Sequence, residues 1–156
     1  MNRQLFAIWI LFSIHACFAF SLSYSDNKNF SLQKEKDIII LHENDVHCNI
    51  DKYPRLTGLR DSLSAFSHVL LVSSGDFLQG GTAGAISGGQ YISDIMKSVG
   101  YDAVTLGNHE FDFGTEKMKE LLTAAELPIA DCNLYDCETG KRVYAPYILK
   151  DCGSRR

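Results

Sequence analysis

The chain has 156 residues, of which 46% are hydrophobic and 22% are charged, and this composition fits one globular domain with a buried core. The formal net charge is −4 and the sequence has no cluster of Lys and Arg, which argues against a nucleic-acid-binding protein. An anionic substrate would need a locally positive site, and an acidic protein usually makes one with bound metal ions.

The first 19 residues have the order of regions that is typical of a secretory signal peptide. Arg3 precedes an apolar run over residues 5–20, which is too short for a membrane-spanning helix, and Ser-rich polar sequence follows. The small residues Cys17 and Ala19 predict cleavage after Ala19, and a lipoprotein signal at Cys17 is the weaker alternative. We therefore predict no transmembrane segment after signal removal and a secreted, periplasmic or cell-surface location.

After a polar leader over residues 20–36, apolar runs typical of buried strands alternate with segments of helical periodicity. The expected strands are residues 38–41, 69–72, 103–106, 129–130 and 144–149. The expected helices are residues 56–67, residues 92–99 and a segment that begins at about Gly114, has apolar residues at helical spacing over 118–125 and ends before Pro128. The Gly-rich segment 79–89 predicts a loop. This alternation predicts an α/β fold, with a mostly parallel sheet and flanking helices, in one domain over residues 37–156.

Three of the expected strands are followed by side chains that can bind a metal ion. Asp45 and His47 follow the first, Asp76 the second and Asn108 the third. Because ligands of parallel sheets bind at the carboxyl ends of the strands, we expect these side chains to lie close together. A carboxylate and an imidazole two residues apart project from the same side of an extended backbone and suit one divalent ion. Two neighbouring carboxylates would repel each other unless cations lay between them, which favours a bridging role for Asp76.

His109 and Asp112 lie just beyond Asn108. On an extended segment His109 points away from Asn108, so it could face a substrate instead of the metal, and Asp112 could orient the His109 ring and stabilise its protonated form. Purely structural roles remain open as alternatives for three of these groups. Asp112 would also suit the N-terminus of a helix, Asp76 would suit a loop cap, and the Asp45 segment would suit a solvated turn.

Three segments together resemble the first three motifs of the 5′-nucleotidase family, which belongs to the calcineurin-like metallophosphoesterases. These segments are residues 40–47, 75–80 and 107–112, in that order. The resemblance implies the N-terminal half of an αββα sandwich and a hydrolase that removes phosphate from nucleotides outside the cytoplasm. Alternatives with the same chemistry are a cyclic-nucleotide phosphodiesterase and a nucleotide-sugar hydrolase, and an alternative of another class is a non-catalytic secreted metal-binding remnant.

The resemblance also implies roles for single residues. Asp45 and His47 would bind the first of two divalent ions such as Zn²⁺ or Mn²⁺, Asp76 would bridge both, and Asn108 would bind the second. His109 would stabilise the transition state or protonate the leaving group, with Asp112 as its partner. Two neighbouring ions bound in this way would activate a water molecule and hold the phosphoryl oxygens for in-line attack.

The chain departs from the family pattern at several points. Glu43 stands where Thr is usual, and Cys48 stands where a small residue such as Gly is expected, so a charge and a thiol beside the site could change its metal preference or sensitivity to oxidation. No histidine follows His109, although family members carry further histidine ligands and a C-terminal base-binding domain. We therefore expect a domain that is incomplete at its C-terminus, an incomplete second metal site and little catalysis by this chain alone.

The chain contains five cysteines, of which Cys17 would leave with the signal peptide. In an oxidising compartment, Cys132, Cys137 and Cys152 could supply one disulfide, whose connectivity the sequence does not determine. The sequence contains no CxxC pair, so we do not expect a zinc site built from thiolates.

Overall fold

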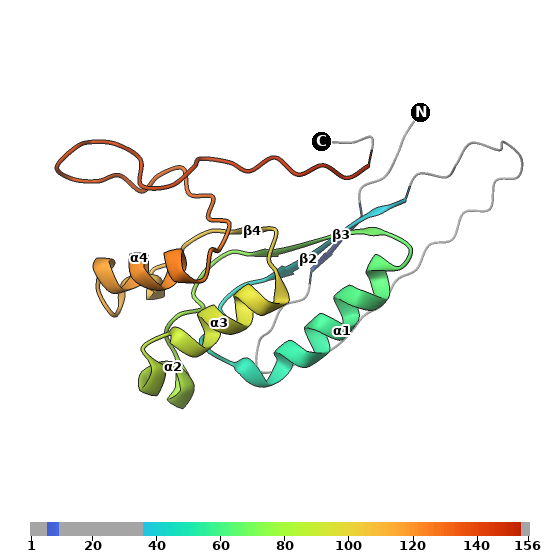
Figure 1. Cartoon of the computed structure of the whole chain (residues 1–156), viewed down its shortest axis with the longest axis horizontal. Helices are drawn as coiled ribbons and strands as arrows, with labels where there is room; N and C mark the ends of the chain where they lie inside the picture. The colour runs from blue at the N-terminus through green and yellow to red at the C-terminus, as the bar shows by residue number, and fades with distance from the viewer. Residues whose placement is uncertain (1–5, 10–35, 154–156) are drawn as a thin grey trace, which may run out of the picture.

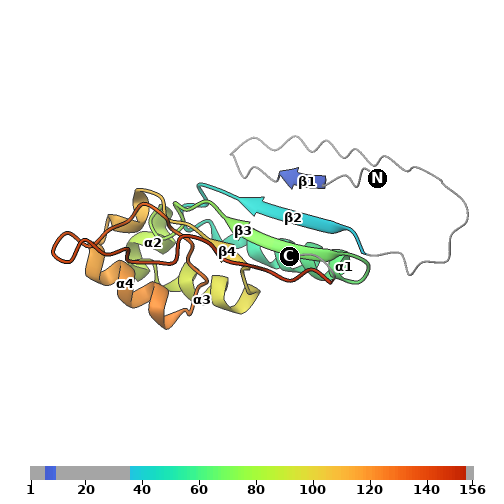
Figure 2. The same ribbon diagram turned by 90° about the horizontal axis from the view of Figure 1, so that it is seen from above.

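The computed structural model describes residues 6–9 and 36–153. Its centre is a parallel sheet of four strands in the order β1-β2-β3-β4 (Figures 1 and 2). The strands are β1 (Phe6–Trp9), β2 (Ile38–Glu43), β3 (His68–Ser73) and β4 (Ala103–Val104). The expected α/β fold with a parallel sheet is therefore confirmed.

The central strands β2 and β3 form because each is a continuous run of apolar, largely β-branched residues. They pair in register from Ile38 opposite His68 to Glu43 opposite Ser73. Leu41 and Leu71 are completely buried at the middle of this pair. Both strands extend beyond the expected ranges and end where the polar site residues begin.

The last two expected strands are wrong in extent, because each contributes only an isolated bridge. Ile129 pairs with Val104, and Ala130 pairs with Ala145, both in parallel orientation. Neither ladder can lengthen. Pro146 has no N–H group to donate, and the chain turns after Ala130 at Asp131, whose carboxylate accepts the backbone N–H groups of Asn133 and Leu134.

The three expected helices occupy the expected segments, with ends that differ by up to three residues. Helix α1 (Tyr53–Ser64) begins three residues before the expected 56–67, because Pro54 suits the first turn of a helix, and it follows the 3-10 helix η1 (Ile50–Lys52). Helices α3 (Gln90–Val99) and α4 (Thr115–Ala124) confirm the two later predictions. Gly100 ends α3 in the left-handed conformation and donates its N–H to the Met96 carbonyl.

A helix, α2 (Gly81–Ser87), occupies the segment that was expected to be a loop. Its glycines mark the ends and one close contact. Gly80 and Gly88 flank the helix with positive φ angles of 142° and 57°. A Cβ atom at Gly84 would lie 3.2 Å from Cys48 Sγ, so the glycine allows α2 to approach the loop after β2.

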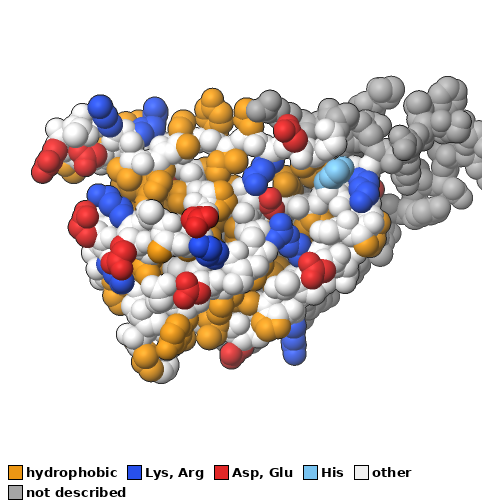
Figure 3. Space-filling model, viewed as in Figure 1, with side chains coloured by type: hydrophobic (Ala, Val, Ile, Leu, Met, Phe, Trp, Pro, Cys, Tyr) orange, Lys and Arg blue, Asp and Glu red, His pale blue; other side chains and the backbone are white. Residues whose placement is uncertain are grey.

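The core lies between the sheet and the helices. Its completely buried members include Leu41, Leu71, Phe77, Ile92, Met96 and Met118. Helices α1 and α3 lie on one side of the sheet, and residues 131–153 run back on the other side (Figure 1). On the face shown in Figure 3, Lys and Arg side chains are interspersed with Asp and Glu.

The predicted signal peptide and polar leader lie outside the described residues, apart from Phe6–Trp9 and Lys36. The described part of the N-terminus pairs in parallel with β2, from Phe6 opposite Ile39 to Trp9 opposite His42. Within the described chain, no helix is both long enough and apolar enough to cross a bilayer. The predictions of signal cleavage and location stay predictions.

The four described cysteines, Cys48, Cys132, Cys137 and Cys152, are free thiols. The disulfide that the last three could supply is therefore not formed in this structure. Cys132 and Cys137 are exposed, whereas Cys152 is buried.

Candidate metal centre

The loop after β2 is bound to the loop after β3 by three backbone hydrogen bonds. The N–H groups of Asp45, His47 and Cys48 donate to the carbonyls of Gly75, Asp76 and Phe77, at 3.2, 2.9 and 3.1 Å. The pairing of the strands thus continues past their ends into the two loops. This continuation brings the polar residues of both loops to one place at the edge of the sheet.

Three of the expected site residues meet there. Asp45, His47 and Asp76 each offer one ligand atom, and these atoms lie within 4.8 Å of one another. Two carboxylates and one imidazole are a donor set that suits Zn²⁺ or Mn²⁺, so the residues fit a divalent ion. Asp45 and His47 side chains are 55% and 39% exposed, which leaves the group open to an ion from solvent.

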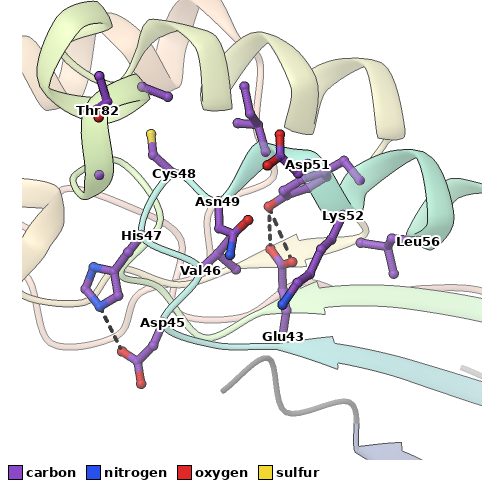
Figure 4. Close-up of a pocket in the computed structure, with 14 residues that line it drawn as sticks. Glu43, Asp45, Val46, His47, Cys48, Asn49, Asp51, Lys52, Leu56 and Thr82 are labelled. Carbon is purple, nitrogen blue, oxygen red and sulfur yellow. Dashed lines mark hydrogen bonds and ion pairs between the residues drawn. The ribbon is translucent and has the colours of Figure 1, made fainter. Parts of the chain in front are cut away.

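A hydrogen bond determines which ring nitrogen of His47 is available to a metal ion. Its Nδ1 lies 3.1 Å from the carbonyl oxygen of Gln79. A carbonyl oxygen can only accept, so Nδ1 carries the proton and the lone pair of Nε2 stays available. Nε2 lies 3.9 Å from Asp45 Oδ1, and Figure 4 marks this contact with a dashed line.

The backbone of these loops is held in a conformation that L residues rarely adopt. The positive-φ non-glycine residues of the described chain are Asp45 (54°), His47 (49°), Cys48 (55°), Asp76 (58°) and Glu126 (53°). All but Glu126 lie in the two loops of the site. Such strain costs about 1 to 3 kcal/mol per residue and clusters at functional sites, which argues against an ordinary solvated turn for Asp45 and His47.

Glycines permit the close approach of the loops. A Cβ atom at Gly107 would collide with the Asp76 carboxylate, and one at Gly75 would collide with the backbone N of Gly107. A Cβ atom at Gly80 would lie 2.5 Å from the Cβ of His47. Each glycine therefore makes room for a neighbouring candidate ligand or its loop.

Asn108 and His109 lie at the start of the 3-10 helix η2 (His109–Phe111), which follows β4. The Asn108 side chain is exposed. The backbone N–H of His109 donates to Asp76 Oδ1 at 2.8 Å. The rings of His109 and His47 pack edge to face with centroids 4.9 Å apart, so His109 adjoins the three-residue group.

Asp112 contacts the His109 ring as the sequence led us to expect. The distance from His109 Nδ1 to Asp112 Oδ2 is 2.6 Å, and this hydrogen bond raises the pKa of His109. Helix α4 begins only at Thr115, beyond Gly114, so Asp112 lies outside its first turn. The geometry fits the expected orienting role.

Replacing Asp112 by Asn should lower the pKa of His109, because the amide cannot stabilise the imidazolium charge. The pKa of His109 can be followed by NMR titration of the metal-free chain, with Glu116→Gln, at an exposed position of α4, as the control. Because the pKa of His109 is raised in the folded state, the interaction of its protonated ring with Asp112 stabilises the folded chain at pH values below the unfolded-state pKa of about 6.5. This stabilisation is lost as the pH rises through the folded-state pKa. An unchanged His109 pKa in Asp112→Asn would contradict the assigned contact.

Glu43 and Cys48, the two residues beside the site that depart from the family pattern, have side chains that point into the protein. Glu43 is 2% exposed, it accepts a hydrogen bond from the Tyr53 hydroxyl at 3.1 Å, and burial raises its pKa to about 7. Burial also raises the pKa of the Cys48 thiol to about 11, and its sulfur faces the Leu78 carbonyl at 3.4 Å. Both residues line a cavity of about 470 Å³ next to the loop that carries His47 (Figure 4). They therefore offer the site neither an exposed charge nor a reactive thiolate.

Sequence reasoning did not single out Glu110, which is completely buried directly after His109. Its carboxylate accepts hydrogen bonds from backbone N–H groups of the loops after β3 and β4. The one signal in the sequence is a charged residue beside Phe111 within a motif segment. That signal does not distinguish a buried carboxylate from an exposed one.

Comparison with known proteins places this geometry in a family. The sequence model of the calcineurin-like phosphoesterases matches residues 38–153. A snake venom 5′-nucleotidase of Gloydius brevicauda is 34% identical over 116 residues, which are 63% of this chain and 20% of that protein. The trifunctional nucleotide phosphoesterase protein YfkN of Bacillus subtilis is 30% identical over 122 residues, which are 76% of this chain and 8% of that protein.

The crystal structure of the calcineurin-like phosphoesterase YfkN from Bacillus subtilis has a TM-score of 0.58 and 28% identity. The likeness covers 71% of this chain and 41% of that chain, which confirms the expected metallophosphoesterase fold. The chain thus spans a minor part of the length of the relatives that it matches. Since the family match covers most of its residues, the chain belongs to the calcineurin-like phosphoesterase family.

Proposed function

We propose that the chain forms the metal-binding part of a hydrolase that removes phosphate from nucleotides outside the cytoplasm, as a 5′-nucleotidase does. The observation that carries this proposal is the convergence of Asp45, His47 and Asp76 beside His109. The similarity to a 5′-nucleotidase and to a nucleotide phosphoesterase supports a nucleotide as the substrate. The predicted signal peptide supports a location outside the cytoplasm.

In this proposal Asp45 and His47 would hold one divalent ion, Asp76 would be shared with a second ion, and Asn108 would contribute to that second site. When bound, the two ions supply positive charge that polarises the phosphoryl group and lowers the pKa of a water molecule. The chain's own part is to fix the ligand atoms. His47 is oriented by the Gln79 carbonyl, and Asp76 Oδ1 is held by the backbone N–H of His109.

His109 is the residue that we assign to proton transfer. Its hydrogen bond to Asp112 raises its pKa and uses Nδ1, which leaves Nε2–H of the protonated ring to face a substrate. From there it can hydrogen-bond a phosphoryl oxygen as charge develops, or protonate the leaving oxygen. Asp112 orients the ring and stabilises its protonated form, as the carboxylate does in other His and Asp pairs.

A cyclic-nucleotide phosphodiesterase or nucleotide-sugar hydrolase is the second candidate function. The similarity to a protein named as a trifunctional nucleotide phosphoesterase favours it, because the same metal centre can serve several phosphoesters. The metal-binding residues are shared between these activities. An activity assay therefore has to distinguish between these substrates.

The test is metal binding and hydrolysis by the purified full chain. We expect calorimetry to detect weak binding of about one Mn²⁺ per chain and slow, metal-dependent release of phosphate from AMP, far below a typical enzymatic kcat of about 10 s⁻¹. A preference for 2′,3′-cyclic AMP or UDP-glucose over AMP would favour the second candidate. Metal binding without any hydrolysis would favour a non-catalytic remnant, and no binding of Mn²⁺ or Zn²⁺ would refute the proposed centre.

A further inference from the structure

The buried carboxylate of Glu110 lies between the loops that carry two of the proposed metal ligands. It is 0% exposed and accepts four backbone hydrogen bonds. Oε1 accepts from Phe77 and Leu78 at 2.7 and 3.0 Å. Oε2 accepts from Asp76 and Gly107 at 2.8 and 2.6 Å. All four partners are donors, so the side chain acts only as an acceptor, as a carboxylate does.

The loop after β3 presents its N–H groups to Glu110 as a concave nest. Gly75 and Asp76 have φ angles of 98° and 58°, and this left-handed turn points three consecutive N–H groups, those of residues 76–78, to one side. Nests of this kind bind anions. Here the bound anion is a side chain of the protein, supplied by the turn after β4.

The two turns hold each other in both directions. The backbone N–H of Asp76 donates to Glu110, and the carboxylate of Asp76 accepts the backbone N–H of His109. Asn108 lies between Gly107 and His109, whose N–H groups are both used in these contacts. Glu110 therefore holds the backbone of Asp76 and Phe77 and that of Gly107, just before Asn108, without being one of the proposed ligands itself.

We propose that Glu110 is a positioning residue of the metal centre, which holds Asp76 and Asn108 at the spacing that ion binding requires. This inference rests on the metal centre proposed above. Charge-assisted hydrogen bonds are roughly twice as strong as neutral ones, and partners of metal ligands typically change metal affinity 10- to 100-fold when they are lost. A carboxylate that served folding alone would affect stability and leave metal affinity unchanged.

The experiment compares Glu110→Gln and Glu110→Asp with Asp102→Asn in the full chain. The Gln side chain replaces one acceptor oxygen with an NH₂ group that faces backbone donors, and Asp keeps the charge but is one methylene too short to reach all four. Asp102 is the control, because its carboxylate accepts the backbone N–H of Leu71 at 2.9 Å but lies before β4, beside β3 rather than in the loops that carry the proposed ligands. Its other partners are Arg60 and Lys150.

The readouts are Mn²⁺ affinity by calorimetry, thermal stability, and hydrogen exchange of the amides of residues 76–78 and 107 in the metal-free chain. Glu110→Gln should bind Mn²⁺ about 10 to 100 times more weakly than wild type, with faster exchange at those amides. The Mn²⁺ affinity of Glu110→Asp should lie between that of Glu110→Gln and that of wild type. Asp102→Asn should lose thermal stability and keep its Mn²⁺ affinity within about twofold of wild type.

A folded Glu110→Gln variant with wild-type Mn²⁺ affinity would overturn the inference. So would an equal loss of affinity in Asp102→Asn, or failure of both Glu110 variants to fold while Asp102→Asn folds, since Glu110 would then serve the fold as a whole. A wild-type chain that bound no Mn²⁺ would refute the proposed centre instead. In that case amide exchange still decides whether Glu110 orders the two turns.

Discussion

Asp76→Asn is expected to weaken Mn²⁺ binding by more than about 100-fold, a larger loss than is typical when a partner of a metal ligand is removed. The substitution removes the charge of the proposed bridging ligand. The Asn side chain keeps Oδ1, so it can still accept the His109 N–H that Asp76 accepts at 2.8 Å. The loops should therefore keep their positions while the ion loses a carboxylate.

The same variant should be at least as stable as wild type without metal. Asp45 and Asp76 place two carboxylates in one cluster, and their repulsion is relieved when one becomes neutral. With free Mn²⁺ at about 100 times the wild-type Kd, binding should stabilise wild type by about 2.7 kcal/mol and Asp76→Asn far less.

Calorimetry gives the affinities, and thermal unfolding with and without Mn²⁺ gives the stabilities. Asp94→Asn, at an exposed position of α3, is the control for loss of a carboxylate away from the site. Equal Mn²⁺ affinity in Asp76→Asn and wild type would show that Asp76 is not a ligand.

Gly75→Ala is expected to destabilise the chain by about 2 to 5 kcal/mol. A non-glycine residue in a left-handed conformation costs about 1 to 2 kcal/mol, and Gly75 has a φ of 98°. Overpacking costs about 1 to 3 kcal/mol more, because the new Cβ would collide with Gly107 N and lie 2.8 Å from the carbonyl carbon of Leu106. Relief of this clash should push apart the loops after β3 and β4, so Mn²⁺ affinity should fall as well.

Gly58→Ala is the matched control, because it makes the same chemical change within helix α1. A Cβ at Gly58 would have no atom within 4 Å, and alanine is the better helix former by about 0.8 to 1.0 kcal/mol. Denaturant unfolding should therefore show a lower free energy of unfolding than wild type for Gly75→Ala and a higher one for Gly58→Ala. Equal stabilities would mean that the close approach at Gly75 is not required.

Local sequence determined the framework of this protein. The apolar runs that became β2 and β3, and the helical period of α3 and α4, depend on residues near one another in the chain, so their pattern alone predicts them. The position of Asp45, Asp76 and Asn108 just after strands was also predictable. In a parallel sheet this places them at one edge.

Where local signals were ambiguous, the prediction was wrong. The glycines of segment 79–89 suggested a loop, but Gly84 is needed for contact with Cys48, and helix α2 forms around it. Residues 129–130 and 144–149 were expected to be strands because they are apolar. Pro146 and the turn at Asp131 limit them to single bridges.

Only the tertiary structure decided how the site residues are held. The left-handed backbone at Asp45, His47 and Asp76 is unfavourable in isolation and persists because hydrogen bonds join loops about 30 residues apart, as in the bond from His47 N–H to the Asp76 carbonyl. Glu110 can be buried because its four donors come from two separate turns. The sequence thus specified which groups reach the edge of the sheet, and long-range contacts specified their orientation, because strain and buried charge are stable only when distant segments satisfy them.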